Sequence, residues 1–273
     1  MSPARRENAG ALEFLLECIG FPPDTNVADL ARHILREGDP TPWRGKDGRH
    51  LRLPLAGGLE VQLDQELQGE LPTLWPHYRP RRRLRVEVQR VREVPDSPFD
   101  AFLIGVANPR HPGDPPELAA EYPLATYLTD RRRLPRDLER GHVLALSLAG
   151  FALDVSWVGP NDQARDPSVY ELPYGAALHP LGGADEPGGC MEVSARVREV
   201  RHLMNPLTGI PVEVLEIDAP GRPLELFLSR WQLEVDGLPA PRPGWRVEGS
   251  FLFTGRVAGG LPPVRPRRAE HFG

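Results

Sequence analysis

Side chains suited to binding a polyanion gather in residues 75–92, where aromatic residues are followed closely by arginines. Aromatic rings stack on nucleic-acid bases and guanidinium groups hold phosphates, so this combination is typical of surfaces that bind single strands. Acidic residues lie in the same stretch, and a solvated basic face is the simpler interpretation of the run. The candidate contacts for nucleic acid or another polyanion are Trp75, Tyr78, Arg81, Arg82 and Arg83.

The other side chains with catalytic or metal-binding potential form no recognisable motif. The eight histidines are scattered, and no two are four residues apart as in helical zinc sites. Gly45-Lys46-Asp47 lacks the upstream glycine and the following serine or threonine of a phosphate-binding loop. Asp162 and Asp166 are best interpreted as part of a solvated loop. His77 and His179 are the histidines to inspect for a cleft, although isolated histidines near aromatic residues are usually structural. The sequence therefore predicts no catalytic residue, no metal ligand and no cofactor.

Composition places the chain of 273 residues among globular proteins, with 40% hydrophobic and 26% charged residues. The 32 prolines favour short elements joined by many turns. The net charge is −5, and no part of the chain has the strong basic excess of a dedicated nucleic-acid binder. Cys18 and Cys190 are too few for a disulfide framework or a zinc site. Because no signal peptide or membrane-spanning apolar run is found, we expect a cytoplasmic location.

The N-terminal residues have the apolar spacing of two short helices. Leu12, Leu15, Leu16 and Ile19 predict a helix over 9–19 that ends at Gly20. Asp24 or Thr25 is the expected N-cap of a second helix, whose apolar face extends to Ile34 and which ends at Gly38. The pattern predicts an αα-hairpin.

An internal repeat organises the remaining chain, because Arg90–Val94 returns unchanged as Arg196–Val200. Each copy lies in an alternating, strand-like segment whose apolar phase then shifts, which predicts a bulge. Pro123–Leu128 matches Pro223–Leu228 in the same order after the repeat. The predicted divisions are 1–48 for the helical hairpin, 49–83 for a β hairpin and connecting segment, 84–180 for a first β module, 181–190 for a linker, 191–261 for a second β module, and 262–273 for a flexible tail.

Each copy is predicted to contain three strands, a short polar or helical link, and a long closing strand. That order fits a five-stranded barrel of OB type, and it also fits a plain meander. The predicted fold class is α+β and mostly β, with an N-terminal αα-hairpin followed by two duplicated small β modules. Arg90 and Arg196 are expected to occupy equivalent places in the two modules.

Three short segments carry a resemblance to a known family. Leu16–Phe21, Leu172–Gly175 and Gly244–Val257 resemble motifs of an uncharacterised family of bacterial cytoplasmic proteins. The resemblance implies a match over nearly the whole chain. That family has no assigned activity, so the resemblance implies no functional residue.

The expected function is that of a non-catalytic cytoplasmic interaction or scaffold protein, which presents a surface built from duplicated β modules to one or more protein partners. One alternative is binding of single-stranded nucleic acid or another polyanion through residues 75–92. Another alternative is an enzyme whose site is assembled from scattered residues. No membrane partner is expected.

Overall fold

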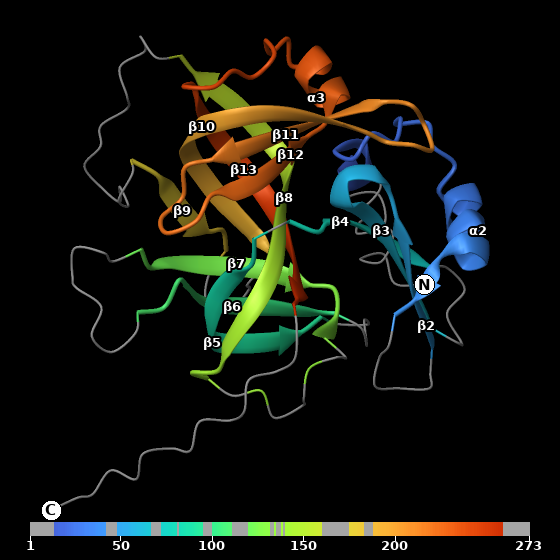
Figure 1. Ribbon diagram of the computed structural model, residues 1–273, viewed down its shortest axis with the longest axis horizontal. Coiled ribbons are helices and arrows are strands. Elements are labelled where there is room, and N and C mark those ends of the chain that lie inside the picture. Colours follow the sequence, from blue (N-terminus) through green and yellow to red (C-terminus); the bar gives the residue numbers. More distant parts are fainter. Residues whose placement is uncertain are drawn as a thin grey trace, which may run out of the picture.

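The computed structural model describes residues 14–41, 48–66, 72–80, 82–94, 100–110, 120–131, 134, 138, 140–159, 175–182 and 188–258. Of these residues, 55% lie in strands and 13% in helices. They form a four-stranded antiparallel sheet beside a nine-stranded mixed sheet (Figure 1). The prediction of a mostly β protein is confirmed.

The N-terminal unit, here the described residues from Phe14 to Tyr78, contains one complete described helix, α2 (Val27–Glu37). Its N-cap is Asn26, not Asp24 or Thr25, because the Asn26 side chain accepts hydrogen bonds from two backbone amides of the first turn. The predicted face is confirmed, since Leu30, Ala31 and Ile34 are buried. The helix ends before Gly38, as expected.

Residues 14–17 are helical, and the residues before Phe14 lie outside the described part of the chain. The described residues therefore form no clear αα-hairpin. The segment turns at Gly20, where φ is +83° and a Cβ would lie 3.0 Å from Val212 Cγ2. A glycine is needed here because L side chains rarely adopt this conformation and the neighbouring strand is too close.

The four-stranded sheet has the order β1 (Asp39–Pro40), β2 (Gly48–Pro54), β3 (Leu59–Glu66) and β4 (Thr73–Tyr78). The short 3-10 turn η1 (Ala56–Gly58) joins β2 to β3. The predicted hairpin over residues 51–63 is confirmed, with Leu51 opposite Leu63. β4 contacts both β8 and β13 of the larger sheet (Figure 1).

The nine-stranded sheet contains both predicted β modules. The first supplies β5 (Leu84–Glu93), β6 (Ala101–Ala107), β7 (Tyr122–Leu128) and β8 (Val143–Val158), and β9 (Ala177–Pro180) follows. The second supplies β10 (Cys190–Met204), β11 (Pro211–Ile217), β12 (Leu224–Leu228), the helix α3 (Arg230–Val235) and β13 (Arg246–Val257). The order is β11-β12-β8-β5-β6-β7-β13-β10-β9, with additional β10–β11 and β8–β13 pairs.

The two repeats have the same pairings, and each borrows a strand from the other. β5 pairs with β6 and β8, as β10 pairs with β11 and β13. The third strand of each repeat then runs parallel to the long strand of the other, in the pairs β7–β13 and β12–β8. Neither repeat is thus a clear barrel built from its own described strands, and the two share one sheet.

The long strands β8 and β13 pair antiparallel, with Gly150 opposite Phe253. Gly150 and Phe253 are as far apart in the sequence as Gly141 and Gly244, the glycines that precede the two strands. Equivalent positions of the two repeats therefore lie opposite each other at this point of the β8–β13 pair. A Cβ on Gly150 would lie 2.6 Å from Leu226 Cδ2 and 3.0 Å from the Phe253 ring. Glycine at this position therefore allows the two repeats to approach.

The repeated pentapeptide does not occupy equivalent positions in the two repeats. The predicted bulges are present, but the extra residue is Gln89 in β5 and Arg198 in β10. The bulge therefore precedes Arg90 in the first copy and follows Arg196 in the second. The expectation that Arg90 and Arg196 are equivalent was wrong, because the position of the bulge, and not the identical sequence, determines how each strand pairs with its neighbours.

The core has two parts. One cluster is formed by side chains of the nine-stranded sheet and runs through both repeats, with Tyr122, Phe251 and Phe253 among its largest side chains. The other joins the N-terminal unit to the outer side of the larger sheet, where Phe151 and Phe227 are fully buried. The N-terminal unit thus covers the region where the two repeats meet.

Candidate functional site

Trp75 and Tyr78, the predicted stacking residues, are only 6% and 3% exposed. The Trp75 ring lies 4.0 Å from that of Tyr127, and the Tyr78 ring lies 5.0 Å from that of Phe227. Tyr127 and Phe227 occupy matching places in β7 and β12. The two aromatic residues of β4 thus attach the N-terminal unit to both repeats, and their rings do not face solvent.

The predicted arginines are placed differently. Arg82 and Arg83 are exposed in the segment between β4 and β5, and Arg81 lies outside the described residues. The structure therefore does not bring the aromatic and basic members of the predicted contact together on one open surface.

A polar side of the N-terminal sheet faces the larger sheet. In β3, Glu60, Gln62 and Asp64 alternate with apolar residues and share one face, and all three are buried. Residues directly opposite share a face, so this side also carries Arg52 of β2 and His77 of β4.

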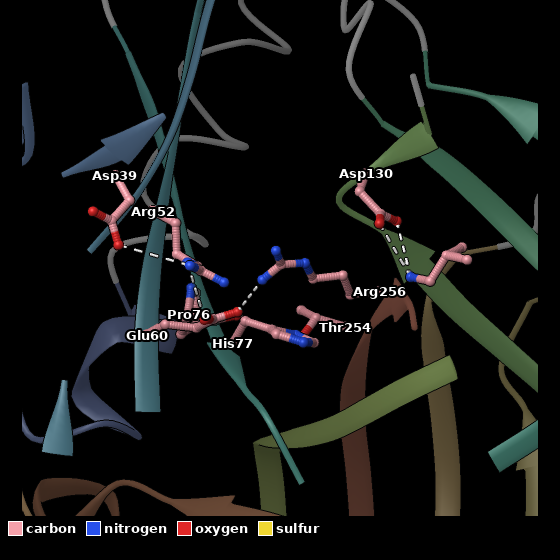
Figure 2. Close-up of polar contacts among 9 residues, drawn as sticks. Asp39, Arg52, Glu60, Pro76, His77, Asp130, Thr254 and Arg256 are labelled. Atoms are coloured by element: carbon pink, nitrogen blue, oxygen red, sulfur yellow. Dashed lines mark hydrogen bonds and ion pairs between the residues drawn. The ribbon is translucent and has the colours of Figure 1, made fainter. Parts of the chain in front are cut away.

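A chain of charges crosses this interface (Figure 2). Arg256 of β13 donates from Nη1 to Glu60 Oε1 at 2.6 Å. Arg52 Nε lies 3.6 Å from Glu60 Oε2, and Arg52 Nη2 lies 3.7 Å from Asp39 Oδ2. The Glu60 side chain is only 4% exposed, so its charge depends on these two arginines.

His77 is fully buried beside this charge chain. The Thr254 hydroxyl donates to the Pro76 carbonyl at 3.4 Å, so it can accept from His77 Nδ1 at 2.9 Å (Figure 2). Burial, and then the charge of Arg256, lower the pKa of His77 to about 3. The ring is therefore neutral at pH 7, with its proton on Nδ1 and an acceptor at Nε2.

A second histidine lies on the same polar side. His50 Nδ1 pairs with Asp64, and both side chains are buried. Burial by itself would lower the pKa of His50. The hydrogen bond and the charge of Asp64, together with the charges of Asp130 and Asp100, outweigh the effect of burial, so the pKa of His50 is raised overall. Asp130 also accepts from the Val257 amide, at 3.2 and 3.1 Å (Figure 2).

These groups are of the types that perform acid–base chemistry, yet their described partners are all other groups of the same chain. Their arrangement can fix how the N-terminal sheet sits on β13, because an unpaired charge here is costly. No group of three or more histidine, cysteine or acidic residues in the described ranges is placed to hold a metal ion.

The remaining sequence candidates lie elsewhere. His179 is half-buried in β9, opposite Glu192. Lys46, Asp162 and Asp166 lie outside the described residues. Cys18 is buried, its thiol donates to the Ala152 carbonyl, and burial raises its pKa to about 12, which makes it unreactive.

Sequence reasoning missed the polar face of β3. Acidic residues at alternate positions of an apolar strand, Glu60 and Asp64, were a signal that could have been noticed. Arg256, the partner of Glu60, carries no such signal, because it is far along the chain and its neighbours in the sequence do not indicate the pairing.

The exposed large apolar side chains of the described residues are Met204, Leu207 and Val235, at 53%, 45% and 84% exposure. The first two lie at the end of the β10–β11 hairpin, in residues 204–210, here called the hairpin tip. Pro206 and Pro211 are exposed beside them. No charged residue occurs between Met204 and Val212, so the hairpin tip itself carries no charged side chain.

Comparisons with protein-family models, with curated proteins and with solved structures gave no match. No described helix is long and apolar enough to cross a membrane. The function must therefore be argued from the residues of this chain.

Proposed function

We propose that the protein is a non-catalytic interaction protein and that its hairpin tip inserts into an apolar depression on a partner protein. The observation that carries the proposal is the exposure of Met204 and Leu207, three residues apart, on a tip that is hydrogen-bonded to the N-terminal unit. Exposed apolar side chains that gather on one surface are typical of interaction sites.

The rigidity of the tip comes from hydrogen bonds at its base. Asn205 is fully buried and donates from Nδ2 to the Ile19 carbonyl at 2.8 Å, while its Oδ1 accepts from the Leu207 amide at 2.9 Å. Thr208 Oγ1 donates to the Gly20 carbonyl at 2.7 Å. The N-terminal unit thus fixes the tip before any partner binds, which lowers the conformational entropy lost on binding.

The chemistry of the tip favours a partner surface that is apolar and concave. Because Met204 and Leu207 are about half exposed, full burial of each can contribute roughly half of the 1.5–3 kcal/mol of a fully exposed side chain. Methionine also adapts to irregular pockets. Two convex tips would bury little area against each other, so a different protein fits better than a second copy.

The buried polar groups support a non-catalytic role. Inside the interface between the two sheets, His50 pairs with Asp64, and Glu60 pairs with Arg256. Charges that fix the relative position of two sheets serve the presentation of a rigid surface.

We also propose that each repeat completes a barrel of OB type with the long strand of the other. The pairings β5-β6-β7-β13-β8 and β10-β11-β12-β8-β13 each return to their first strand. In the chain, α3 lies between β12 and β13, which are the third and last strands of the second repeat. This proposal predicts a single cooperative unit in native-state hydrogen exchange. Independent opening of β5–β7 and β10–β12 would contradict it.

The cytoplasmic location and membership of the uncharacterised bacterial family that the chain resembles remain proposals as well. Recovery of the native protein in the soluble cytoplasmic fraction would support the location, and recovery in the membrane fraction would contradict it.

The experiment for the main proposal begins with co-purification of the tagged protein from its native cells, and the partner is then purified. The dissociation constant is measured for the wild type, for Met204→Ser/Leu207→Ser, and for the control Val235→Ser. We expect the double variant to bind at least about tenfold more weakly, since it removes two anchors. The control should bind as the wild type does.

An unchanged dissociation constant for the double variant would refute the tip as the contact. Sedimentation of the protein alone measures its oligomeric state, and so tests whether a second copy of this chain binds the tip. A dimer that is lost in the same double variant would mean that a second copy of this chain, and not another protein, occupies the tip.

A further inference from the structure

We propose that the protein has a second binding surface, separate from the hairpin tip, which holds the phosphodiester backbone of single-stranded nucleic acid without reading its bases. This surface consists of Arg79, Arg82, Arg83 and Arg222, here called the junction arginines. All four are exposed. The proposal is independent of the function proposed for the tip.

Two segments far apart in the sequence bring these side chains together. Arg79, Arg82 and Arg83 lie in the segment that connects β4 to β5. Arg222 lies in the turn between β11 and β12, and its Nη1 donates to the Arg83 carbonyl at 2.7 Å. The first repeat, the second repeat and the N-terminal sheet therefore meet at this surface.

The junction arginines form no ion pair with any residue that the structure describes. The arginines of β10 differ in this respect. Arg196 and Arg198 pair with Asp218, and Arg201 pairs with Glu225. The acidic residues that flank Arg222 in the sequence, Asp218 and Glu225, are thus already neutralised by other arginines. The junction keeps a local positive charge although the whole chain is acidic.

The chemistry of this surface selects phosphate. Guanidinium groups bind phosphate oxygens bidentately, and several in succession can follow a phosphodiester chain. The exposed large apolar residues of the described chain, Met204, Leu207 and Val235, are not among the junction residues, so the surface offers no apolar anchor for a lipid bilayer.

Stacking of bases on Trp75 or Tyr78 is excluded from this contact by the burial of both rings. Trp75 and Tyr78 are buried against Tyr127 and Phe227, and they cannot receive a base without opening the interface. Recognition then depends on the backbone charges alone. We infer that affinity is insensitive to sequence, and that an abasic strand binds as well as a normal strand of the same length.

The test is fluorescence anisotropy with the full-length protein and a labelled single-stranded DNA of about 20 nucleotides at low salt, where backbone contacts are strongest. The variant Arg82→Ala/Arg83→Ala is compared with Arg36→Ala/Arg49→Ala, which removes the same charge from exposed arginines of α2 and β2 that have no described ion pair. Arg222→Ala tests the second segment. None of these side chains is buried, so the fold should be retained.

We expect the junction double variant to bind at least about tenfold more weakly than the wild type, and the control double variant to bind within about twofold of it. The slope of log affinity against log salt should fall in magnitude by about 1.4 in the junction variant, because each phosphate contact contributes about 0.7 for single strands. Arg222→Ala should weaken binding in the same direction, and the abasic strand should bind within about twofold of the normal strand.

Three results would overturn the proposal. The first is no binding to the oligonucleotide at low salt. The second is an equal loss in the two double variants, which would mean a general charge effect. The third is binding to vesicles of phosphatidylserine and phosphatidylcholine without binding to the oligonucleotide, which would assign the junction arginines to a lipid headgroup. A clear loss of affinity for the abasic strand would also contradict the proposal, because it would show that the bases are contacted.

Discussion

Replacement of the buried His77 by asparagine should remove a large part of the acid sensitivity of the protein. His77→Asn keeps an amide that can donate to Thr254 Oγ1, and it removes the group that gains a proton in acid. The neutral ring is favoured in the folded state because burial and Arg256 lower its pKa to about 3 from the model-peptide value of 6.5.

The sign follows from proton binding. Between the two pKa values the unfolded chain binds more protons at this position than the folded chain, so stability falls as the pH falls through this window. Between about pH 7.5 and pH 4.5, His77 alone should lower the free energy of unfolding of the wild type by about 2.5 kcal/mol. The asparagine variant starts less stable at neutral pH, but it lacks this loss.

The assay is urea unfolding followed by tryptophan fluorescence, at several pH values for both proteins. The carboxylates contribute in the same way to both, so their effects cancel in the difference between the two curves. That difference should shrink by about 2.5 kcal/mol over the interval. Parallel curves for the wild type and His77→Asn would refute the account of this histidine.

Three further substitutions test the interface and the strand pairing. Arg256→Met should lower the free energy of unfolding by about 3–5 kcal/mol, because it leaves Glu60 buried with only the longer contact to Arg52. The double variant Glu60→Leu/Arg256→Met should lose less stability, and an equal loss in the two variants would contradict a buried charge at Glu60. Gly150→Ala should cost about 1–3 kcal/mol in thermal unfolding, since its Cβ would lie 2.6 Å from Leu226 Cδ2, and an unchanged melting temperature would contradict the tight contact. His50 should stabilise the protein below the pKa it has in the unfolded chain, and this stabilisation should be lost as the pH rises through its raised pKa in the folded protein. The difference in free energy of unfolding between the wild type and His50→Asn should therefore become smaller toward alkaline pH.

The strands and the second helix could be predicted from local pattern. Leu51 and Leu63 face each other across the predicted hairpin, and the bulges in β5 and β10 lie where the apolar phase shifts. These features depend on alternation and turn residues within a few positions, which the sequence displays directly.

The exchange of strands between the repeats could not be predicted. The pairs β7–β13 and β12–β8 join segments far apart in the chain, and their residues are equally suited to an open sheet or to two separate barrels. The prediction that Arg90 and Arg196 are equivalent failed for the same reason. Arg198 is the bulge residue because of the pairing between β10 and β11.

The candidate contact at residues 75–83 was interpreted as one surface because aromatic and basic residues are adjacent in the sequence. The structure separates them, since β4 is an interface strand that buries Trp75 and Tyr78 while the following segment exposes Arg82 and Arg83. Conversely, nothing in the sequence marks Met204 and Leu207 as exposed, because a short apolar run in a hairpin is just as compatible with burial.

The most direct test of the proposed function is the rate of Met204 oxidation by dilute peroxide in the free protein and in its co-purified complex, read by mass spectrometry. Met204 is 53% exposed and Met191 is fully buried, so Met191 serves as the internal control. We predict that the complex protects Met204 while Met191 stays reduced in both samples. An equal rate of Met204 oxidation in the free and bound protein would contradict the hairpin tip as the partner contact.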